Sequence, residues 1–412
     1  MDSGLPSAPS GVPVPVPVSA RVPVSLATRR ALMIAGSNGT THLATFRPNR
    51  KYRWVASYDK RVLLCKPGDE TSGFLFLFSM PDMKMISCFD VASVVYPSHI
   101  QRVQNIWRPM WIRCLCVSRG ARLVAFCLPA EDVILPDQHG DGNNVVFVVD
   151  VASKTTVFSQ RRTNVADLNF SADGEWLYEL DEPNINDDAN EETVFSRRTS
   201  GPDAWTRCDV VARWDEDPCA LCRLLVGQDS LGVVVRGPVG KDKIVMLDAN
   251  PLREIVLHDG RDMITEAFFA LDGRRLIVGV NPVIAVYLID GATRDDVRFT
   301  PGWSNIVAMD ISGRMMYTID PWKSIHAYGF DETGFGEEQA VVTARENEVV
   351  VGTSVFATFV LFDKSANTFR VLSRYAPIAA NVLAVLCDRR WRRFFVDADG
   401  DHAIVSRMLS FC

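Results

Sequence analysis

The sequence predicts an all-β protein, and more specifically a β-propeller built from four-stranded antiparallel blades. Three observations lead to this prediction. From Ala31 onward, short runs of β-forming residues alternate with turn residues and show almost no helical periodicity. A two-part phrase of four such runs recurs along the chain. Its period is about forty to fifty residues, the length of one propeller blade.

The first half of the phrase is an alternating strand, a tight polar turn and a second strand. The clearest copy has strands at residues 166–170 and 176–180 around a turn at 171–174. Further copies surround turns at Gly120, Gly273 and Gly313. Glycine reaches the positive φ that tight hairpin turns need, so each of these sites predicts a hairpin.

The second half of the phrase is an apolar strand that ends on aspartate and is followed by another β-rich run. The strand ends of this kind are Asp150, Asp248, Asp290, Asp331 and Asp363. A single small sheet cannot bury both faces until neighbours stack around a ring, and a sandwich would not repeat one phrase at this spacing. The number of phrases predicts seven blades, with eight as the alternative.

The chain divides into a tail and one domain. Residues 1–29 are rich in proline and valine, and proline lacks the donor that a sheet needs, so we expect a disordered, solvated tail there. Residues 30–412 are expected to form a single propeller. The isolated β run at 31–35 is expected to pair with the last unit, at 380–408, and so to close the ring and remove two exposed edges.

Composition excludes several classes of function. The chain has 412 residues, a formal net charge of −6 and a pI near 5.6, which argues against binding nucleic acid through bulk electrostatics. Short basic pairs such as Arg161-Arg162 and Arg197-Arg198 are typical of solvated loops or strand edges. The ten cysteines lack zinc-site spacing. With no signal peptide and no apolar run long enough to cross a membrane, we expect a soluble cytoplasmic or nuclear protein.

Two carboxylate-rich segments are candidates for metal sites. Residues 397–401 carry three alternating aspartates, but the glycine and glutamate that complete a helix-loop-helix calcium loop are missing. Residues 137–144 are equally typical of a connection between strands. The six histidines are scattered, and no nucleophile, phosphate-loop or dinucleotide motif is present. The sequence therefore predicts no catalytic, cofactor or metal residue.

Two segments are candidates for an interaction surface. The segment 181–192 holds six acidic residues and no basic residue, and mutual repulsion predicts an extended loop that could face a basic partner. A solvated insertion is the alternative reading. Two tryptophans flank Arg108-Pro109 and suit an interaction hot spot or burial between blades. The candidate residues are Asp181, Glu182, Asp187, Asp188, Glu191, Glu192, Trp107 and Trp111.

The repeated phrases resemble those of WD40-like and YVTN-like propellers over residues 31–412. Where a WD repeat ends its third strand on Trp-Asp, this chain has dipeptides such as Val149-Asp150 and Phe362-Asp363, and Gly-His occurs nowhere. The resemblance implies a non-enzymatic scaffold that binds other proteins through its faces and rim. The alternative is a propeller enzyme, lactonase-like or another hydrolase, with an axial metal. A structural component of a larger particle or virion would use the same surfaces.

Overall fold

A computed structural model of the chain describes most of the segment between residues 52 and 373. The described residues are 52–58, 61–67, 74–80, 85–95, 112–130, 142–162, 164–181, 192–214, 220–236, 242–247, 253–256, 264–269, 275–280, 283–288, 297–299, 305–309, 315–319, 324–331, 334–353, 358–363, 365 and 368–373. The predicted tail at 1–29, the closing run at 31–35 and the last unit at 380–408 lie outside these residues.

The described strands form six four-stranded sheets and one three-stranded sheet, numbered here in chain order. Sheet 1 consists of β1 (Tyr52–Ala56), β2 (Val62–Pro67), β3 (Phe74–Ser79) and β4 (Met85–Asp90). Sheet 2 consists of β5 (Leu115–Val117), β6 (Leu123–Pro129), β7 (Asn144–Asp150) and β8 (Thr155–Arg162). Sheet 3 consists of β9 (Val165–Phe170), β10 (Trp176–Asp181), β11 (Glu192–Arg198) and β12 (Cys208–Trp214).

The remaining sheets follow the same order. Sheet 4 consists of β13 (Ala220–Val226), β14 (Leu231–Arg236), β15 (Lys243–Met246) and β16 (Arg253–Val256). Sheet 5 consists of β17 (Ile264–Phe269), β18 (Arg275–Val280), β19 (Val283–Leu288) and β20 (Val297–Phe299). Sheet 6 consists of β21 (Asn305–Met309), β22 (Met315–Ile319), β23 (Ser324–Asp331) and β24 (Gly334–Thr343). Sheet 7 has β25 (Glu348–Thr353), β26 (Thr358–Asp363) and β27 (Thr368–Ser373). Two short helices, α2 (Val91–Val95) and the 3₁₀ turn η1 (Arg119–Ala121), complete the described elements.

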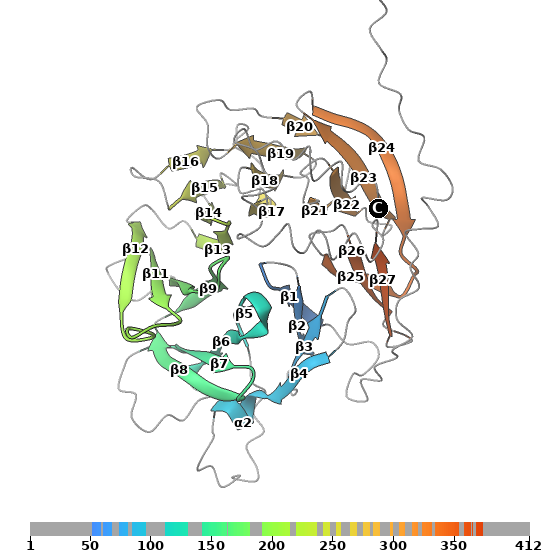
Figure 1. The fold of residues 1–412 in the computed structure, drawn as a ribbon. Helices are drawn as coiled ribbons and strands as arrows, with labels where there is room; N and C mark the ends of the chain where they lie inside the picture. Colours follow the sequence, from blue (N-terminus) through green and yellow to red (C-terminus); the bar gives the residue numbers. More distant parts are fainter. Residues whose placement is uncertain are drawn as a thin grey trace, which may run out of the picture.

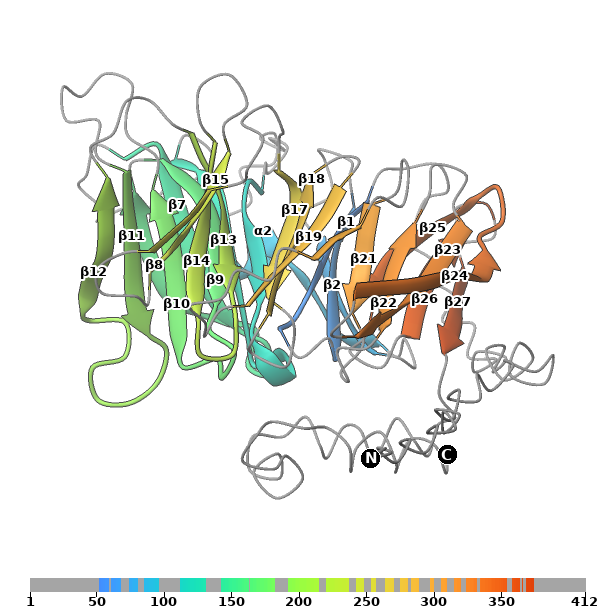
Figure 2. The ribbon, with the colours of Figure 1, turned by 90° about the horizontal axis from the view of Figure 1, so that it is seen from above.

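Every sheet is an antiparallel meander in which strands adjacent in sequence are hydrogen-bonded neighbours. The first strand of each sheet lies toward the centre and the last toward the rim, so the sheets are arranged around a ring (Figure 1). In the view turned by 90°, the sheets stand next to one another (Figure 2). The predicted fold class is confirmed: the protein is an all-β propeller with four-stranded antiparallel blades.

The hydrophobic core lies between neighbouring sheets and not within any one of them. Separate buried clusters join sheets 1 and 2, 2 and 3, 3 and 4, and 4 and 5. Sheet 7 packs on sheet 6 through Tyr317 and Phe359, whose rings are 5.1 Å apart. It also packs on sheet 1 through Trp54 and Phe362, at 5.8 Å. Each fully buried Phe or Leu stabilises the fold by about 1.5–3 kcal/mol, so the sheets stabilise one another around the ring.

The turn after the first strand recurs with the same hydrogen bonds in sheets 1, 2 and 3. A serine closes it by donating its backbone N–H to the carbonyl of the residue five positions later, at 2.9 Å in all three. The serine Oγ accepts the N–H of that same residue, at 2.8–3.1 Å. We call this arrangement the serine turn; it spans residues 57–62, 118–123 and 171–176. The same two hydrogen bonds therefore recur at the first turn of three successive sheets, where the sequence predicts a repeated hairpin.

Candidate functional site

The structure describes only part of the predicted interaction surface. Asp181 is the last residue of β10, and its side chain is buried, with 8% of the residue exposed, so it is not available to a partner. Glu192 begins β11. Glu182, Asp187, Asp188, Glu191, Trp107 and Trp111 lie outside the described residues. A role for the rest of the acidic segment and for the two tryptophans stays a prediction.

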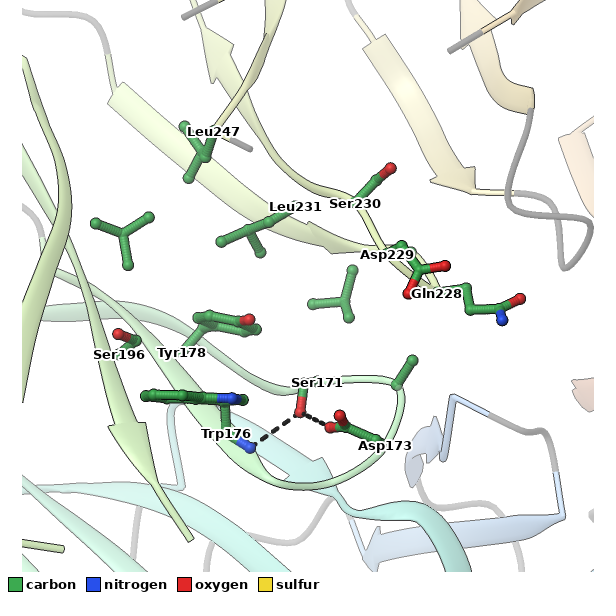
Figure 3. A pocket seen from close by; sticks show the side chains of 14 residues that line it. Ser171, Asp173, Trp176, Tyr178, Ser196, Gln228, Asp229, Ser230, Leu231 and Leu247 are labelled. Carbon is green, nitrogen blue, oxygen red and sulfur yellow. Dashed lines mark hydrogen bonds between the residues drawn. The ribbon is translucent and has the colours of Figure 1, made fainter. Parts of the chain in front are cut away.

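A pocket of about 410 Å³ lies between sheets 3 and 4, beside their first turns (Figure 3). One wall comes from the serine turn of sheet 3 and from strands β10 to β12, and the other from the β13–β14 turn and strand β14. Sheet 3 contributes Ser171, Ala172, Asp173, Trp176, Tyr178, Ser196 and Val211. Sheet 4 contributes Val226, Gly227, Gln228, Asp229, Ser230, Leu231 and Leu247.

The pocket lies where the repeat is broken. In sheet 4 the backbone N–H of Gly227 donates to the carbonyl of Ser230 at 2.7 Å, so this turn encloses two residues, whereas the serine turn encloses four. Gly227 occupies the place of the serine, and a Cβ there would come within 3.0 Å of the Phe269 ring of sheet 5. Packing against sheet 5 therefore favours glycine, and the shorter turn leaves space beside sheet 3.

The sheet 3 wall of the pocket is held rigidly. The Ser171 hydroxyl donates to Asp173 Oδ1 at 2.5 Å, and the same oxygen accepts the Glu175 N–H at 2.9 Å. Gly174 has a φ of +79°, which favours glycine, and its carbonyl accepts a hydrogen bond from Thr199 Oγ1 in the loop that follows β11. Asp173 is thereby fixed at the edge of the pocket.

The spacing of the two walls is also fixed. Asp167, on the innermost strand β9 of sheet 3, accepts the N–H of Leu224 on β13 of sheet 4 through Oδ2, at 2.8 Å. The other oxygen of the same carboxylate accepts the N–H of Leu168. Because one carboxylate bonds to both sheets, they cannot slide past each other without breaking a partly buried hydrogen bond.

The pocket lining is acidic and aromatic, with an apolar part. Asp173 and Asp229 are exposed, and among these described lining residues they are the only charged groups. The two carboxylates lie toward one end of the pocket, and the rings of Trp176 and Tyr178 lie toward the other (Figure 3). Leu231 and Leu247 are buried apolar residues on the sheet 4 side.

A second polar feature, a buried charge cluster, joins sheets 2 and 3. Glu179 on β10 is fully buried. Its Oε2 accepts from Arg162 on β8, with an N–O distance of 2.7 Å, and its Oε1 accepts from Arg197 on β11 at 2.8 Å. Each guanidinium also lies over a phenylalanine ring, Arg162 over Phe195 at 4.6 Å and Arg197 over Phe158 at 5.0 Å. The expectation that Arg162 and Arg197 are solvated is therefore wrong: both are paired with a buried carboxylate.

Asp181 lies at the edge of this cluster, where burial disfavours the charged form of its carboxyl. Burial raises the pKa of its carboxyl to about 7, and this outweighs the opposing attraction of Arg162. Within the described residues, its Oδ1 has no hydrogen-bond partner. A protonated carboxyl is therefore favoured here at a pH where an exposed aspartate is ionised.

The described residues contain no group of three or more His, Cys, Asp or Glu side chains close enough to hold a metal ion. They also include no helix long and apolar enough to span a membrane.

No family model and no curated protein matches the sequence. Solved structures do match. A chain of the hydrazine synthase of Kuenenia stuttgartiensis is 12% identical, with a TM-score of 0.50 over 82% of this chain and 99% of that one. A chain of the mitotic checkpoint complex is 10% identical, with a TM-score of 0.50 over 78% of this chain and 88% of that one. The likeness is one of fold.

A third solved structure matches to a similar extent. KlHsv2 with its loop 6CD replaced by a Gly-Ser linker is 10% identical, with a TM-score of 0.51 over 80% of this chain and 95% of that one. At 10–12% identity these matches confirm the predicted β-propeller fold and assign no family. Because one neighbour belongs to an enzyme and another to a checkpoint complex, the function of this propeller has to be argued from its own surface.

Proposed function

We propose that this propeller is a non-enzymatic scaffold whose partners are other proteins. The observation that supports this most directly is the pocket between sheets 3 and 4. Exposed carboxylates on two turns and partly exposed aromatic side chains on strand β10 line it, and aromatic residues in fixed positions are typical of protein-binding hot spots. Exposed residues on a rigid frame bind a partner without losing much conformational entropy.

The architecture that we propose for this scaffold is a seven-bladed ring formed by a single domain over residues 30–412, behind a tail at 1–29. Its support is the packing of sheet 7 on both sheet 6 and sheet 1, which leaves no gap for a further blade between sheets 7 and 1. We further propose a cytoplasmic or nuclear location and no binding to nucleic acid or membrane, on the composition given above.

Affinity capture tests the proposed function. The full chain, tagged at its C-terminus, is captured from its native source, and co-purifying proteins are identified and cross-linked to it. We expect stoichiometric protein partners with cross-links to propeller residues. In parallel, the purified chain is assayed against lactone and ester substrates with and without divalent metal. Recovery of the monomer alone, together with turnover in that panel, would overturn the scaffold proposal in favour of the enzyme alternative.

The closing strand can be tested by truncation. Sheet 7 is the last described sheet and has three described strands. We propose that the run at 31–35 closes the ring by pairing with the last unit, at 380–408. Deleting residues 1–36 should then lower the melting temperature by at least about 5 °C, because a strand and the apolar area it covers are lost. Deleting residues 1–28 should leave the melting temperature unchanged. Equal melting temperatures for the two truncations, measured by calorimetry, would contradict the proposal.

A further inference from the structure

Three cysteine side chains lie in the buried cluster between sheets 2 and 3: Cys114, Cys116 and Cys127. Cys114 directly precedes β5, and Cys127 lies on β6. The register of these two strands pairs Leu115 with Phe126, so one step further along Cys114 stands opposite Cys127. The backbone N–H of Cys127 donates to the Cys114 carbonyl at 3.2 Å, as expected of opposed residues. Both side chains therefore leave the sheet on the same face.

The spacing of opposed residues suits a disulfide bond. In an antiparallel pair their Cα atoms lie about 4.5–5.5 Å apart, and disulfides span about 4.4–6.8 Å. Cys116 is two residues further along and is diagonal to Cys127, at about 7–8 Å. Cys65 on β2 and Cys88 on β4 are separated by the whole of strand β3. Of the described cysteines in sheets 1 and 2, only Cys114 and Cys127 directly face each other.

The two thiols are already joined by hydrogen bonds. A hydrogen bond with Cys114, and then burial, raise the pKa of the Cys127 thiol. The Cys114 thiol in turn donates to two backbone carbonyls on β9 of sheet 3, that of Ala166 at 3.2 Å and that of Val165 at 3.5 Å. The pair thus holds its two sulfurs close together, and one of its thiols connects sheet 2 to sheet 3.

From this geometry we infer that Cys114 and Cys127 are a redox-sensitive dithiol, which a peroxide oxidises to a reversible disulfide. One sulfur attacks a peroxide oxygen, the O–O bond breaks, and the thiol proton leaves with the other oxygen as water. The second sulfur then attacks the sulfenic sulfur so formed. The S–S bond forms, the S–O bond breaks, and the second thiol proton leaves with the hydroxyl as water. Two electrons pass from the sulfurs to the peroxide.

Oxidation changes the contact between the two sheets. A disulfide carries no S–H, so the Ala166 and Val165 carbonyls lose their sulfur donor while β5 and β6 become covalently joined. The thiolate is the attacking species and burial disfavours it, so the reaction needs local opening and is slow. Transient disulfides of this kind are typical of redox sensing in reducing compartments. The inference is independent of the proposed scaffold function.

The test uses the full chain, reduced and then incubated with or without hydrogen peroxide. The remaining thiols are alkylated, and the chain is digested with trypsin without reduction. Cleavage at the flanking arginines puts Cys114 and Cys116 in one peptide and Cys127 in another. Mass spectrometry detects the linked peptides. The variants Cys114→Ser and Cys116→Ser form a matched pair, and serine at position 114 keeps a donor for the Ala166 carbonyl.

We expect peroxide to link the two peptides in the natural chain and dithiothreitol to separate them. Cys116→Ser should form the link as the natural chain does, and Cys114→Ser should form at least about tenfold less of it. Fragmentation of the linked peptides from the natural chain makes the same assignment, even if a variant fails to fold.

Three results would overturn the inference: no link after peroxide, a link through Cys116, or the same mixture of links when the chain is oxidised in urea. The last result would mean that the fold does not select the pair. None of these results bears on the scaffold proposal, which native capture tests separately.

Discussion

Replacing Glu179 with glutamine is expected to lower the free energy of unfolding by about 3–5 kcal/mol. The substitution keeps the shape of the side chain but removes its charge. Arg162 and Arg197 then remain beside a neutral group, with 13% and 4% of their side chains exposed, so neither recovers its hydration. Breaking a buried ion pair by removing one partner is costly for this reason. Urea denaturation followed by circular dichroism measures the loss.

A matched control is Glu175→Gln in the same sheet. Glu175 is exposed in the turn before β10, and its backbone N–H rather than its side chain bonds to Asp173. We expect this change to alter the free energy of unfolding by less than about 0.5 kcal/mol. Equal effects of the two substitutions would show that the buried charge cluster does not stabilise the fold.

Asp181→Asn is expected to make the protein more stable above pH 7 and to have little effect near pH 4. The pKa of Asp181 is about 7 in the folded chain, whereas that of an unfolded aspartate is about 3.9. A raised pKa in the folded state means that the native protein binds the extra proton. Its stabilising contribution is complete below about pH 4 and is lost as the pH rises through 7. The expected gain for the variant at pH 8 is about 2–4 kcal/mol.

Urea denaturation of both proteins at pH 5 and pH 8 measures this difference, and the comparison between variants cancels the other titrating groups. The two predictions are also coupled, because the charge of Glu179 raises the pKa of Asp181. In the Glu179→Gln background the unpaired arginines should lower that pKa, so the advantage of asparagine at position 181 should shrink. The natural chain and the Asp181→Asn variant could instead show the same change in the free energy of unfolding between pH 5 and pH 8. That result would show that burial does not raise the pKa of Asp181.

Much of the fold could be predicted because its signals are local. The turn at 171–174 joins β9 to β10 as predicted, and Asp150, Asp331 and Asp363 end β7, β23 and β26. Sheet 1 was harder to recognise, since its turn at 57–62 contains no glycine. What this turn shares with the others is the serine hydroxyl, which accepts the N–H of Val62, and a glycine pattern does not include it.

The sites could not be predicted because they depend on how sheets face one another. Glu179 occupies an alternating strand position that would face water in a lone hairpin, but in this propeller both faces of a middle strand pack on neighbours. The basic pairs that seemed solvated each supply one arginine to that buried carboxylate. The pocket arises because the first turn of sheet 4 is two residues shorter than the turns described in sheets 1 to 3, which has meaning only once the sheets are placed side by side.

The contact between Trp54 and Phe362 affects how the chain can fold during synthesis. These rings meet across the junction of sheets 1 and 7 although they are about 300 residues apart in sequence. On a ribosome, sheet 1 emerges first, and its face toward sheet 7 has no partner until nearly the whole ring has been made. At typical elongation rates that interval lasts on the order of tens of seconds. During that interval the apolar face of sheet 1 that later meets sheet 7 is exposed to water and to other chains.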